Sequence, residues 1–297
     1  MSIQAKIIKA VTRRTIKRHG LNQEQLVRHL RKAFNNTPTI TLLPRKVTLK
    51  QIREPQFEGD HLGVSNPSTT VLYLHGGAYI GGVTRTYHNL AGRLAKQLHG
   101  EVYLPVYPFA PEHPFPEAVN RVMEAYEYLL ALGKNPSDIV IAGDSAGGGL
   151  TMATMVALRY MGEPMPAAAF CISPWVDLEC TGETMTSKAE VDPFIQKERL
   201  GMMARLYVGD RDLRAPLASP IYADLRGLPP LLIQVGTAET LLDDSTRLAD
   251  KAKASGVKVE LDIWEDMIHV WPIFAPILPE GQRAIERIGE FVRQQIK

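Results

Sequence analysis

A serine between two glycines is the first candidate for chemistry. The segment 143–147 reads GDSAG, follows the apolar run Ile139–Ala142 and precedes a helical pattern that starts at Ala146. This is the strand–turn–helix setting of the G-x-S-x-G nucleophile, in which a tight turn exposes the serine at the N-terminus of a helix. The alternative is a glycine-rich turn that binds phosphate, but no G-x-x-x-x-G-K-S/T motif accompanies it. We therefore predict that Ser145 is a nucleophile in acyl transfer.

The histidines supply a candidate base for that serine. A hydroxyl group attacks a carbonyl only when a neighbouring general base takes its proton. In hydrolases with the G-x-S-x-G turn, the catalytic residues follow one another in the chain as serine, acid and histidine. Of the eight histidines, His269 alone comes after Ser145. Elimination therefore predicts His269 as the base.

Glu239 is the predicted acid. Its carboxylate must orient the imidazole ring and stabilise the imidazolium ion that forms during the reaction. Glu239 lies on the turn after the predicted strand Leu231–Val235, and it comes after Ser145 and before His269. This position satisfies the chain order, and the fold admits either glutamate or aspartate as the acid.

Three aspartates are alternatives to this acid. Asp243 and Asp244 fall in the first turn of the next predicted helix, where carboxylates are common because they interact favourably with the helix dipole. That structural reason is sufficient for both residues. Asp192 is a weaker alternative, because it lies in an irregular segment rather than after a strand of the sheet.

A glycine pair after the first predicted strand indicates an oxyanion hole. Residues 75–79 read HGGAY, and an HGGG-type sequence at this place supplies backbone N–H groups to the oxyanion of lipases and esterases. We predict that Gly76 and Gly77 donate from this loop, and that Ala146 donates because it follows the nucleophile. His75 is expected to brace the loop by hydrogen bonds rather than to transfer protons.

The spacing of apolar residues predicts the helices and strands that position these residues. Short apolar runs alternate with helical patterns from Val47 onward. The predicted strands are Val71–Leu74, Val102–Val106, Ile139–Ala142, Ala167–Ile172 and Leu231–Val235. The predicted helices are Pro116–Leu132, Ala146–Tyr160 and Leu241–Ala254. This alternation predicts an α/β fold with a mostly parallel sheet and helices on both faces.

Two segments outside the alternation are predicted to form a cap. Residues 1–40 read as two helices, the first with apolar residues at helical spacing and the second capped by Asn22. The apolar residues of the first helix are Ile3, Ile7, Ile8 and Val11, and Gly20 and Leu21 mark the junction between the helices. We expect that apolar face to pack on its own domain rather than on a membrane. The catalytic domain is predicted over 41–297, with a cap insertion at about 181–214.

The predicted insertion is rich in methionine and supplies candidates for an acyl pocket. Methionine suits an adaptable apolar surface, and a pocket of limited volume favours short acyl chains. The candidate substrate-binding residues are Tyr79, Met185, Phe194, Met202, Met203, Leu206 and Tyr207. The alternative for each residue of the insertion is that it packs the cap on itself.

Composition narrows the class of protein. The chain has 297 residues, of which 34 are basic and 32 acidic, and this near-balance argues against nucleic acid as a partner. No apolar stretch approaches the roughly 20 residues of a membrane span, so no stable membrane anchor is expected. Cys171 and Cys180 suit free thiols in a cytoplasmic protein better than a disulfide framework. No H-E-x-x-H motif is present, and neither a metal nor a cofactor is expected.

Taken together, these motifs resemble one family, the bacterial hormone-sensitive-lipase-like esterases of the GDSAG type. The likeness runs from about Val71 to the C-terminus. Besides HGGAY and GDSAGG it covers YPFAPEHPFPEA at 107–118, SPWVDL at 173–178, the segment 219–244 and MIHVW at 267–271. The resemblance implies an α/β-hydrolase fold under a helical cap, cofactor-free hydrolysis of short- to medium-chain acyl esters, and often a homodimer.

The sequence departs from the family at two places. The family's YRLAPEHP reads YPFAPEHP here, with Pro108 and Phe109 in place of arginine and leucine, and the family's usual aspartate acid is Glu239. Two other functions are compatible with the same scaffold. A lactone hydrolase or small-molecule deacetylase would use the same residues on a different ester. A non-catalytic ligand-binding receptor is disfavoured, because Ser145 and His269 are both present.

Overall fold

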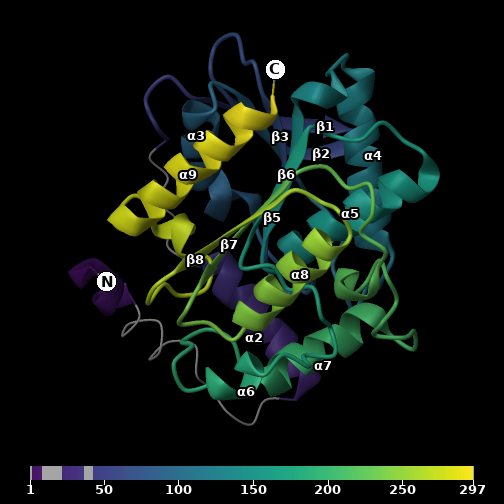
Figure 1. The fold of residues 1–297 in the computed structure, drawn as a ribbon, viewed down its shortest axis with the longest axis vertical. Helices are drawn as coiled ribbons and strands as arrows, with labels where there is room; N and C mark the ends of the chain where they lie inside the picture. Colours follow the sequence, from purple (N-terminus) through teal and green to yellow (C-terminus); the bar gives the residue numbers. More distant parts are fainter. Residues whose placement is uncertain (1, 9–21, 37–42, 297) are drawn as a thin grey trace.

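A twisted sheet forms the centre of the computed structural model, which describes residues 2–8, 22–36 and 43–296 (Figure 1). The spatial order of its strands is β1-β2-β4-β3-β5-β6-β7-β8. Only the β1–β2 and β2–β4 pairs are antiparallel. In chain order the strands are β1 (Thr48–Glu54), β2 (Phe57–Gly63), β3 (Thr70–Leu74), β4 (Glu101–Pro105), β5 (Ile139–Asp144), β6 (Ala168–Ile172), β7 (Leu231–Gly236) and β8 (Val259–Trp264).

The buried strands follow from their uninterrupted apolar runs. Strands β3 to β7 are buried at every residue, and each coincides within a residue or two with a run predicted as a strand. Strand β1 was not predicted, because its sequence TLKQIRE is polar and almost wholly exposed at the edge of the sheet. The predicted α/β architecture with a mostly parallel sheet is therefore confirmed.

Helices cover both faces of this sheet. They are α2 (Gln23–Asn36), α3 (His88–Gln97), α4 (Glu117–Ala131), α5 (Ala146–Met161), α6 (Thr184–Ser187), α7 (Lys197–Val208), α8 (Leu242–Ala254) and α9 (Pro279–Gln295). Helices α3 and α9 lie together on one face, while α4, α5 and α8 lie on the other (Figure 1). Strand β3 shows the division, since Val71 and Tyr73 belong to the core under α3 and α9, and Leu72 and Leu74 to the opposite core.

The segments predicted as a cap gather at one end of the molecule. Helices α2, α6 and α7 lie at the lower end of the view in Figure 1. Leu26 of α2 and Leu200 of α7 are buried in the same apolar core, which joins the two segments. Helix α7 lies within the insertion predicted at about 181–214.

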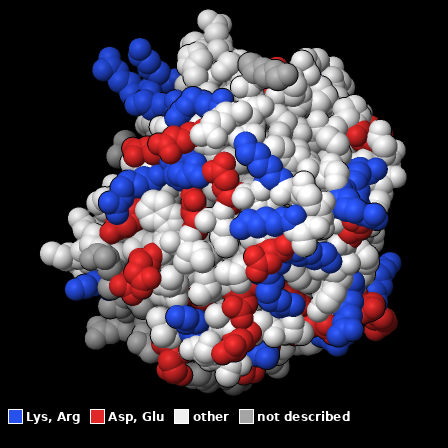
Figure 2. All heavy atoms as spheres, viewed as in Figure 1, with Lys and Arg blue, Asp and Glu red and all other residues white. Residues whose placement is uncertain are grey.

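The first predicted helix has a different buried face from the one expected. Residues 3–8 are helical, but Ile3 and Ile7 are 74% and 57% exposed. Ala5 is buried instead, beside Trp271, with Ile8 packed against the same cluster. Val11, Gly20 and Leu21 lie outside the described residues. Over the face shown in Figure 2, acidic and basic side chains are interspersed. Among the described residues, no helix has the length and apolarity to cross a membrane.

Candidate active site

Ser145 lies on a strained turn between β5 and α5. Its backbone has φ 53° and ψ −123°, a conformation that non-glycine residues rarely adopt and that costs about 1–3 kcal/mol. Its N–H donates to Ile172 O over 3.0 Å, which holds the turn against β6. A Cβ on Gly147 would lie 2.0 Å from Leu74 O, so only glycine allows α5 to approach β3 this closely. The flanking glycine therefore permits the turn that presents the serine.

His269 connects this serine to Glu239. The Ser145 hydroxyl donates to His269 Nε2 over 2.9 Å. On the other side of the ring, Nδ1 donates to Glu239 Oε2, also over 2.9 Å. Because a carboxylate only accepts hydrogen bonds, the imidazole proton belongs on Nδ1 and leaves Nε2 free to accept. The structure thus brings the three predicted residues together in the order that acyl transfer requires.

The Glu239 carboxylate is held by three hydrogen bonds. Oε2 accepts from His269, and Oε1 accepts from the Gly236 N–H over 2.6 Å and from the Ser173 hydroxyl over 2.9 Å. The residue is fully buried on the turn after β7. The orientation of the carboxylate is therefore fixed, and through its hydrogen bond the carboxylate fixes the orientation of the His269 ring.

The charges around His269 favour its protonated form. Burial by itself lowers the pKa of the imidazole, but the hydrogen bond to Glu239 and the charges of Glu239, Asp192 and Asp144 raise the pKa above its ordinary value. Two of these carboxylates, Asp192 and Asp144, make no hydrogen bond to the ring in the described structure. The site is consequently prepared to stabilise an imidazolium ion.

The loop after β3 places its backbone differently from the prediction. The Gly76 N–H donates to the Tyr87 hydroxyl over 3.0 Å and to Asp144 Oδ1 over 3.1 Å. It therefore points into the protein, and its prediction as an oxyanion donor is wrong. The N–H groups of Gly77, Ala78 and Ala146 take part in none of the hydrogen bonds of the described residues. Three donors remain available beside Ser145, one residue further along the loop than expected.

Asp144 and His75 hold this loop from inside. Asp144 accepts hydrogen bonds from Tyr73, Tyr87 and Gly76, and burial raises the pKa of its carboxyl to about 6 in spite of them. Burial lowers the pKa of His75 to about 4, so the ring is neutral, and Nδ1 donates to Gly76 O over 2.8 Å. Both side chains have positions that suit bracing of the loop.

Helix α2 is tied to the same loop by an arginine that the sequence analysis missed. Arg31 Nε donates to Ile80 O over 2.8 Å, and its terminal nitrogens reach Ala110 O over 3.0 Å and both oxygens of Glu112. It therefore joins α2 to the loops after β3 and β4.

Phe109, which departs from the family sequence, packs its ring edgewise against His75 at 5.9 Å between centroids.

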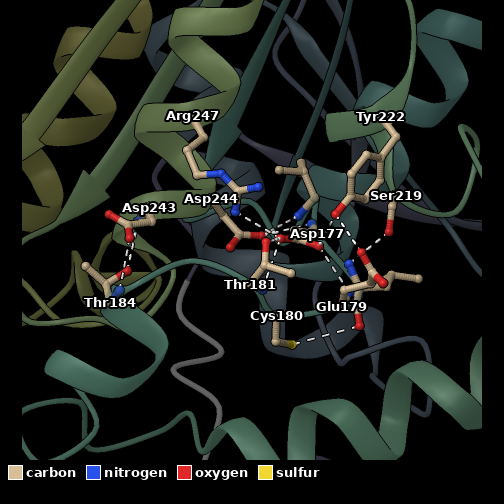
Figure 3. A network of polar contacts seen from close by, with 12 residues as sticks. Asp177, Glu179, Cys180, Thr181, Thr184, Ser219, Tyr222, Asp243, Asp244 and Arg247 are labelled. Carbon is tan, nitrogen blue, oxygen red and sulfur yellow. Dashed lines mark hydrogen bonds and ion pairs between the residues drawn. The ribbon is translucent and has the colours of Figure 1, made fainter. Parts of the chain in front are cut away.

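The rival aspartates occupy structural positions beside the acid. Asp243 Oδ2 accepts the Thr184 N–H over 3.0 Å, and Asp244 Oδ2 accepts the N–H groups of Val176 and Asp177 over 2.9 and 3.0 Å (Figure 3). Asp192 accepts from the backbone and hydroxyl of Thr240. None of the three has a hydrogen bond to His269 in the part of the chain that the structure describes.

The predicted substrate-binding residues divide into two groups. Phe194 lies beside the histidine, with 6.4 Å between the ring centroids. Tyr79 and Tyr207 stack on each other at 3.7 Å with an interplanar angle of 5°, and both are buried. The remaining four, which pack in or against the main apolar core, are Met185, Met202, Met203 and Leu206. These four residues therefore contribute to the packing of that core.

The sequence is similar to those of known hydrolases of the alpha/beta hydrolase fold. A family model of the alpha/beta hydrolase fold matches residues 71–273. An "Acetyl-hydrolase" of Streptomyces hygroscopicus is 46% identical over 224 residues, which cover 75% of each protein. An "Esterase" of Acinetobacter venetianus is 35% identical over 261 residues, covering 87% of this chain and 84% of the relative.

Solved structures extend the likeness over the whole chain. A crystal structure described as an esterase from the bacterial hormone-sensitive lipase family superposes with a TM-score of 0.92 and 43% identity, and the match covers 100% of this chain and 99% of the other. A second esterase structure, from a crystal soaked with p-nitrophenyl butyrate, gives a TM-score of 0.93 and 40% identity over 99% of both chains.

Proposed function

Because the chain belongs to the bacterial hormone-sensitive-lipase-like esterases of the alpha/beta hydrolase fold and is a serine carboxylic-ester hydrolase, we propose that it cleaves short- to medium-chain acyl esters with Ser145, His269 and Glu239 as its catalytic triad. The hydrogen-bonded sequence from Ser145 Oγ through His269 to Glu239, at 2.9 Å for each bond, carries the proposal. These distances suit proton transfer in both directions.

The proposed reaction has two symmetric halves. His269 Nε2 takes the hydroxyl proton while Ser145 Oγ attacks the ester carbonyl carbon, and the carbonyl electron pair moves to oxygen. When the tetrahedral intermediate collapses, the alkoxide leaves with the proton of His269 as an alcohol, and the acyl group remains on Ser145. A water molecule then repeats the attack with His269 as base, and the carboxylic acid is released.

Backbone donors would stabilise the two tetrahedral intermediates. The available N–H groups of Gly77, Ala78 and Ala146 are the proposed oxyanion hole. Ala146 is the first residue of α5, so the helix dipole adds a partial positive charge at the same place. Such donors act strongly in a site that excludes water, and Ser145 and His269 are each only 8% exposed.

Short acyl groups are the proposed substrates. Phe194 lies against His269, and the tyrosines and methionines predicted to line a pocket are largely packed into the core, which limits the room for an acyl chain. The p-nitrophenyl butyrate soaked into crystals of a related esterase has an acyl group of this size. The name of the acetyl-hydrolase relative favours a second candidate, deacetylation of a small molecule by the same residues.

A substrate panel with a nucleophile variant tests both candidates. Among p-nitrophenyl esters from acetate to laurate, hydrolysis should be fastest for acyl chains of about six carbons or fewer. Longer chains should be hydrolysed about tenfold more slowly, which is the discrimination that the walls of a pocket give. Acetylated sugars and lactones belong in the same panel, and preference for either would move the assignment to deacetylase or lactonase. Ser145→Ala should lose about 10⁶ in kcat and fail to react with a fluorophosphonate. A variant that keeps a tenth of the parent turnover would exclude Ser145 as nucleophile.

A further inference from the structure

We propose that Asp192, in the insertion between β6 and β7, is a positioning residue for the reaction: it fixes the backbone next to Glu239 and places a second negative charge beside His269. The inference rests on the proposed function of Ser145, His269 and Glu239. It concerns a carboxylate that touches neither the reacting atoms nor the imidazole ring, and that acts through its neighbours.

Asp192 joins two segments that are far apart in the chain. Its Oδ2 accepts the N–H of Thr240 over 2.8 Å and the Thr240 hydroxyl over 3.1 Å. Its Oδ1 accepts the N–H groups of Phe194 and Ile195 over 2.8 and 3.0 Å. Thr240 directly follows Glu239, and the Phe194 ring contacts His269. The Asp192 carboxylate therefore fixes Thr240, next to Glu239, relative to Phe194, beside His269.

Asp192 carries a buried charge as well as these hydrogen bonds. The residue is fully buried, and no lysine or arginine of the described segments forms an ion pair with it. A buried carboxylate without a cation costs stability, even when hydrogen bonds satisfy both of its oxygens. Four donors converge on its two oxygens, and an amide side chain has a single acceptor oxygen, so a carboxylate suits this fastening. The charge has a further use if a positive charge develops nearby.

That positive charge is the imidazolium ion of His269. The charges that raise the pKa of this ring most come from three elements: Glu239 on the turn after β7, Asp192 in the insertion, and Asp144 at the end of β5. Glu239 contributes through a hydrogen bond, and the other two contribute through charge. Asp192 is the only one of the three supplied by the insertion. The cap would therefore complete the electrostatic environment of the base as well as cover the site.

A neighbouring contact gives a matched control. Asp243 also binds the insertion to the start of α8, because its Oδ2 accepts the Thr184 N–H over 3.0 Å while its own N–H donates to Thr184 Oγ1 over 3.0 Å (Figure 3). The charges that raise the pKa of His269 most are those of Glu239, Asp192 and Asp144, and Asp243 is not one of them. Asp243→Asn therefore removes one carboxylate charge from the contact between the insertion and α8, at a residue that does not touch Thr240 or Phe194 in the described structure.

The experiment compares kcat/KM for p-nitrophenyl butyrate as a function of pH in the parent enzyme, Asp192→Asn, Asp243→Asn and Glu239→Gln. Asp192→Asn should lower kcat/KM by about 10- to 100-fold, as small misplacements of a catalytic group do, and should move the acid limb of the profile to lower pH. Asp243→Asn should leave the acid limb in place. Glu239→Gln should lose far more activity at every pH.

Two results would overturn the inference. One is an acid limb in Asp192→Asn that stays at the pH of the parent, and the other is an equal displacement in Asp243→Asn. If Glu239→Gln instead behaves like the parent, the triad assignment itself has failed, and the two failures are thereby distinguished. Should Asp192→Asn not fold, as judged by circular dichroism, Asp192→Ser removes the same charge with a smaller acceptor and should show the same displacement.

Discussion

The Ser173 hydroxyl donates a hydrogen bond to Glu239 Oε1 over 2.9 Å, and Ser173 Oγ accepts the Val270 N–H over 3.2 Å. A single buried side chain therefore links the acid to the residue that follows the histidine. Ser173 comes directly after β6, with φ 47°, so its position is set by the end of that strand. Glu239 and the loop of His269 are therefore held together by contacts from the ends of β6 and β7.

Ser173→Ala should lower kcat and destabilise the fold. The variant leaves the Val270 N–H without an acceptor inside the protein, at a cost of about 1–3 kcal/mol, and frees Glu239 to turn. Ser219→Ala is the matched control, because Ser219 is equally buried and accepts the Leu178 N–H over 2.8 Å away from the triad. Both should unfold at lower urea concentration. A Ser173→Ala variant as active as Ser219→Ala would contradict a role in positioning Glu239.

Glu239→Gln should reduce kcat by about 10⁴, the loss seen when a triad acid can no longer select the histidine tautomer. The glutamine amide removes the charge that stabilises the imidazolium ion while keeping the shape of the side chain. Asp244→Asn provides the comparison, since its carboxylate binds the backbone of Val176 and Asp177. Steady-state kinetics decide between them: collapse of Asp244→Asn with an active Glu239→Gln would transfer the role of the acid.

The pH dependence of the parent enzyme should show a raised histidine pKa. His269 must be neutral to accept the serine proton, and the surrounding carboxylates raise its pKa above the ordinary value of 6.5. As pH falls, protonation of the ring therefore begins earlier than for a free histidine, and kcat/KM should reach half its plateau above pH 6.5. A half-point below that value, in a profile measured with a substrate that does not titrate, would count against the assigned environment.

Gly77→Ala should damage the oxyanion hole. Gly77 has φ 134°, and a Cβ there would lie 1.8 Å from Gly81 O, so the loop must move. The expected loss in kcat is about 10²–10³, comparable to removal of one oxyanion donor. Gly133→Ala is the control: its φ is also positive, at 80°, but a Cβ meets nothing within 4 Å. Equal activity in the two variants, each checked for folding, would mean that the Gly77 N–H is not used.

Arg31→Met should lower kcat/KM by about tenfold without loss of secondary structure. The substitution removes the hydrogen bonds that tie α2 to Ile80 O and Ala110 O, so the oxyanion loop loses support from outside. Arg28→Met on the same helix is the control, because Arg28 is exposed and, among the described residues, its ion pair is with Glu24 within α2. The two variants should differ in kinetics and agree in circular dichroism. If Arg28→Met is equally impaired, the tether is not the cause.

The sequence predicts the parts of this site that depend on local pattern. An apolar run, a glycine-flanked serine and a helical pattern identify the turn at Ser145, and chain order selects His269 and Glu239, which the structure joins by hydrogen bonds. These inferences need no knowledge of side-chain packing. The turn at Ser145 is predictable because the residues that it requires lie within a few positions of one another.

The missed features depend on contacts between distant residues. The available N–H groups in the loop after β3 lie one residue further along than predicted because Tyr87 and Asp144 bind the Gly76 N–H, and neither contact is visible in the HGGAY segment. Tyr79 suits a pocket by type, yet it stacks on Tyr207, which lies in α7. The strand β1 is polar because it forms an exposed edge. Tertiary packing decided each case.

The first residues of the chain have a practical bearing on how the enzyme is handled. The backbone N–H and hydroxyl of Ser2 donate to the two carboxylate oxygens of Glu280, each over 2.9 Å, and Ala5 packs under the loop that carries His269. The last turn of α9 lies well away from this contact, at the top of Figure 1. An affinity tag, a fluorophore or a solid support joined near Ser2 would press on the histidine loop. Attachment beyond α9 would leave the loop undisturbed, and this makes it the better point for immobilising an active catalyst.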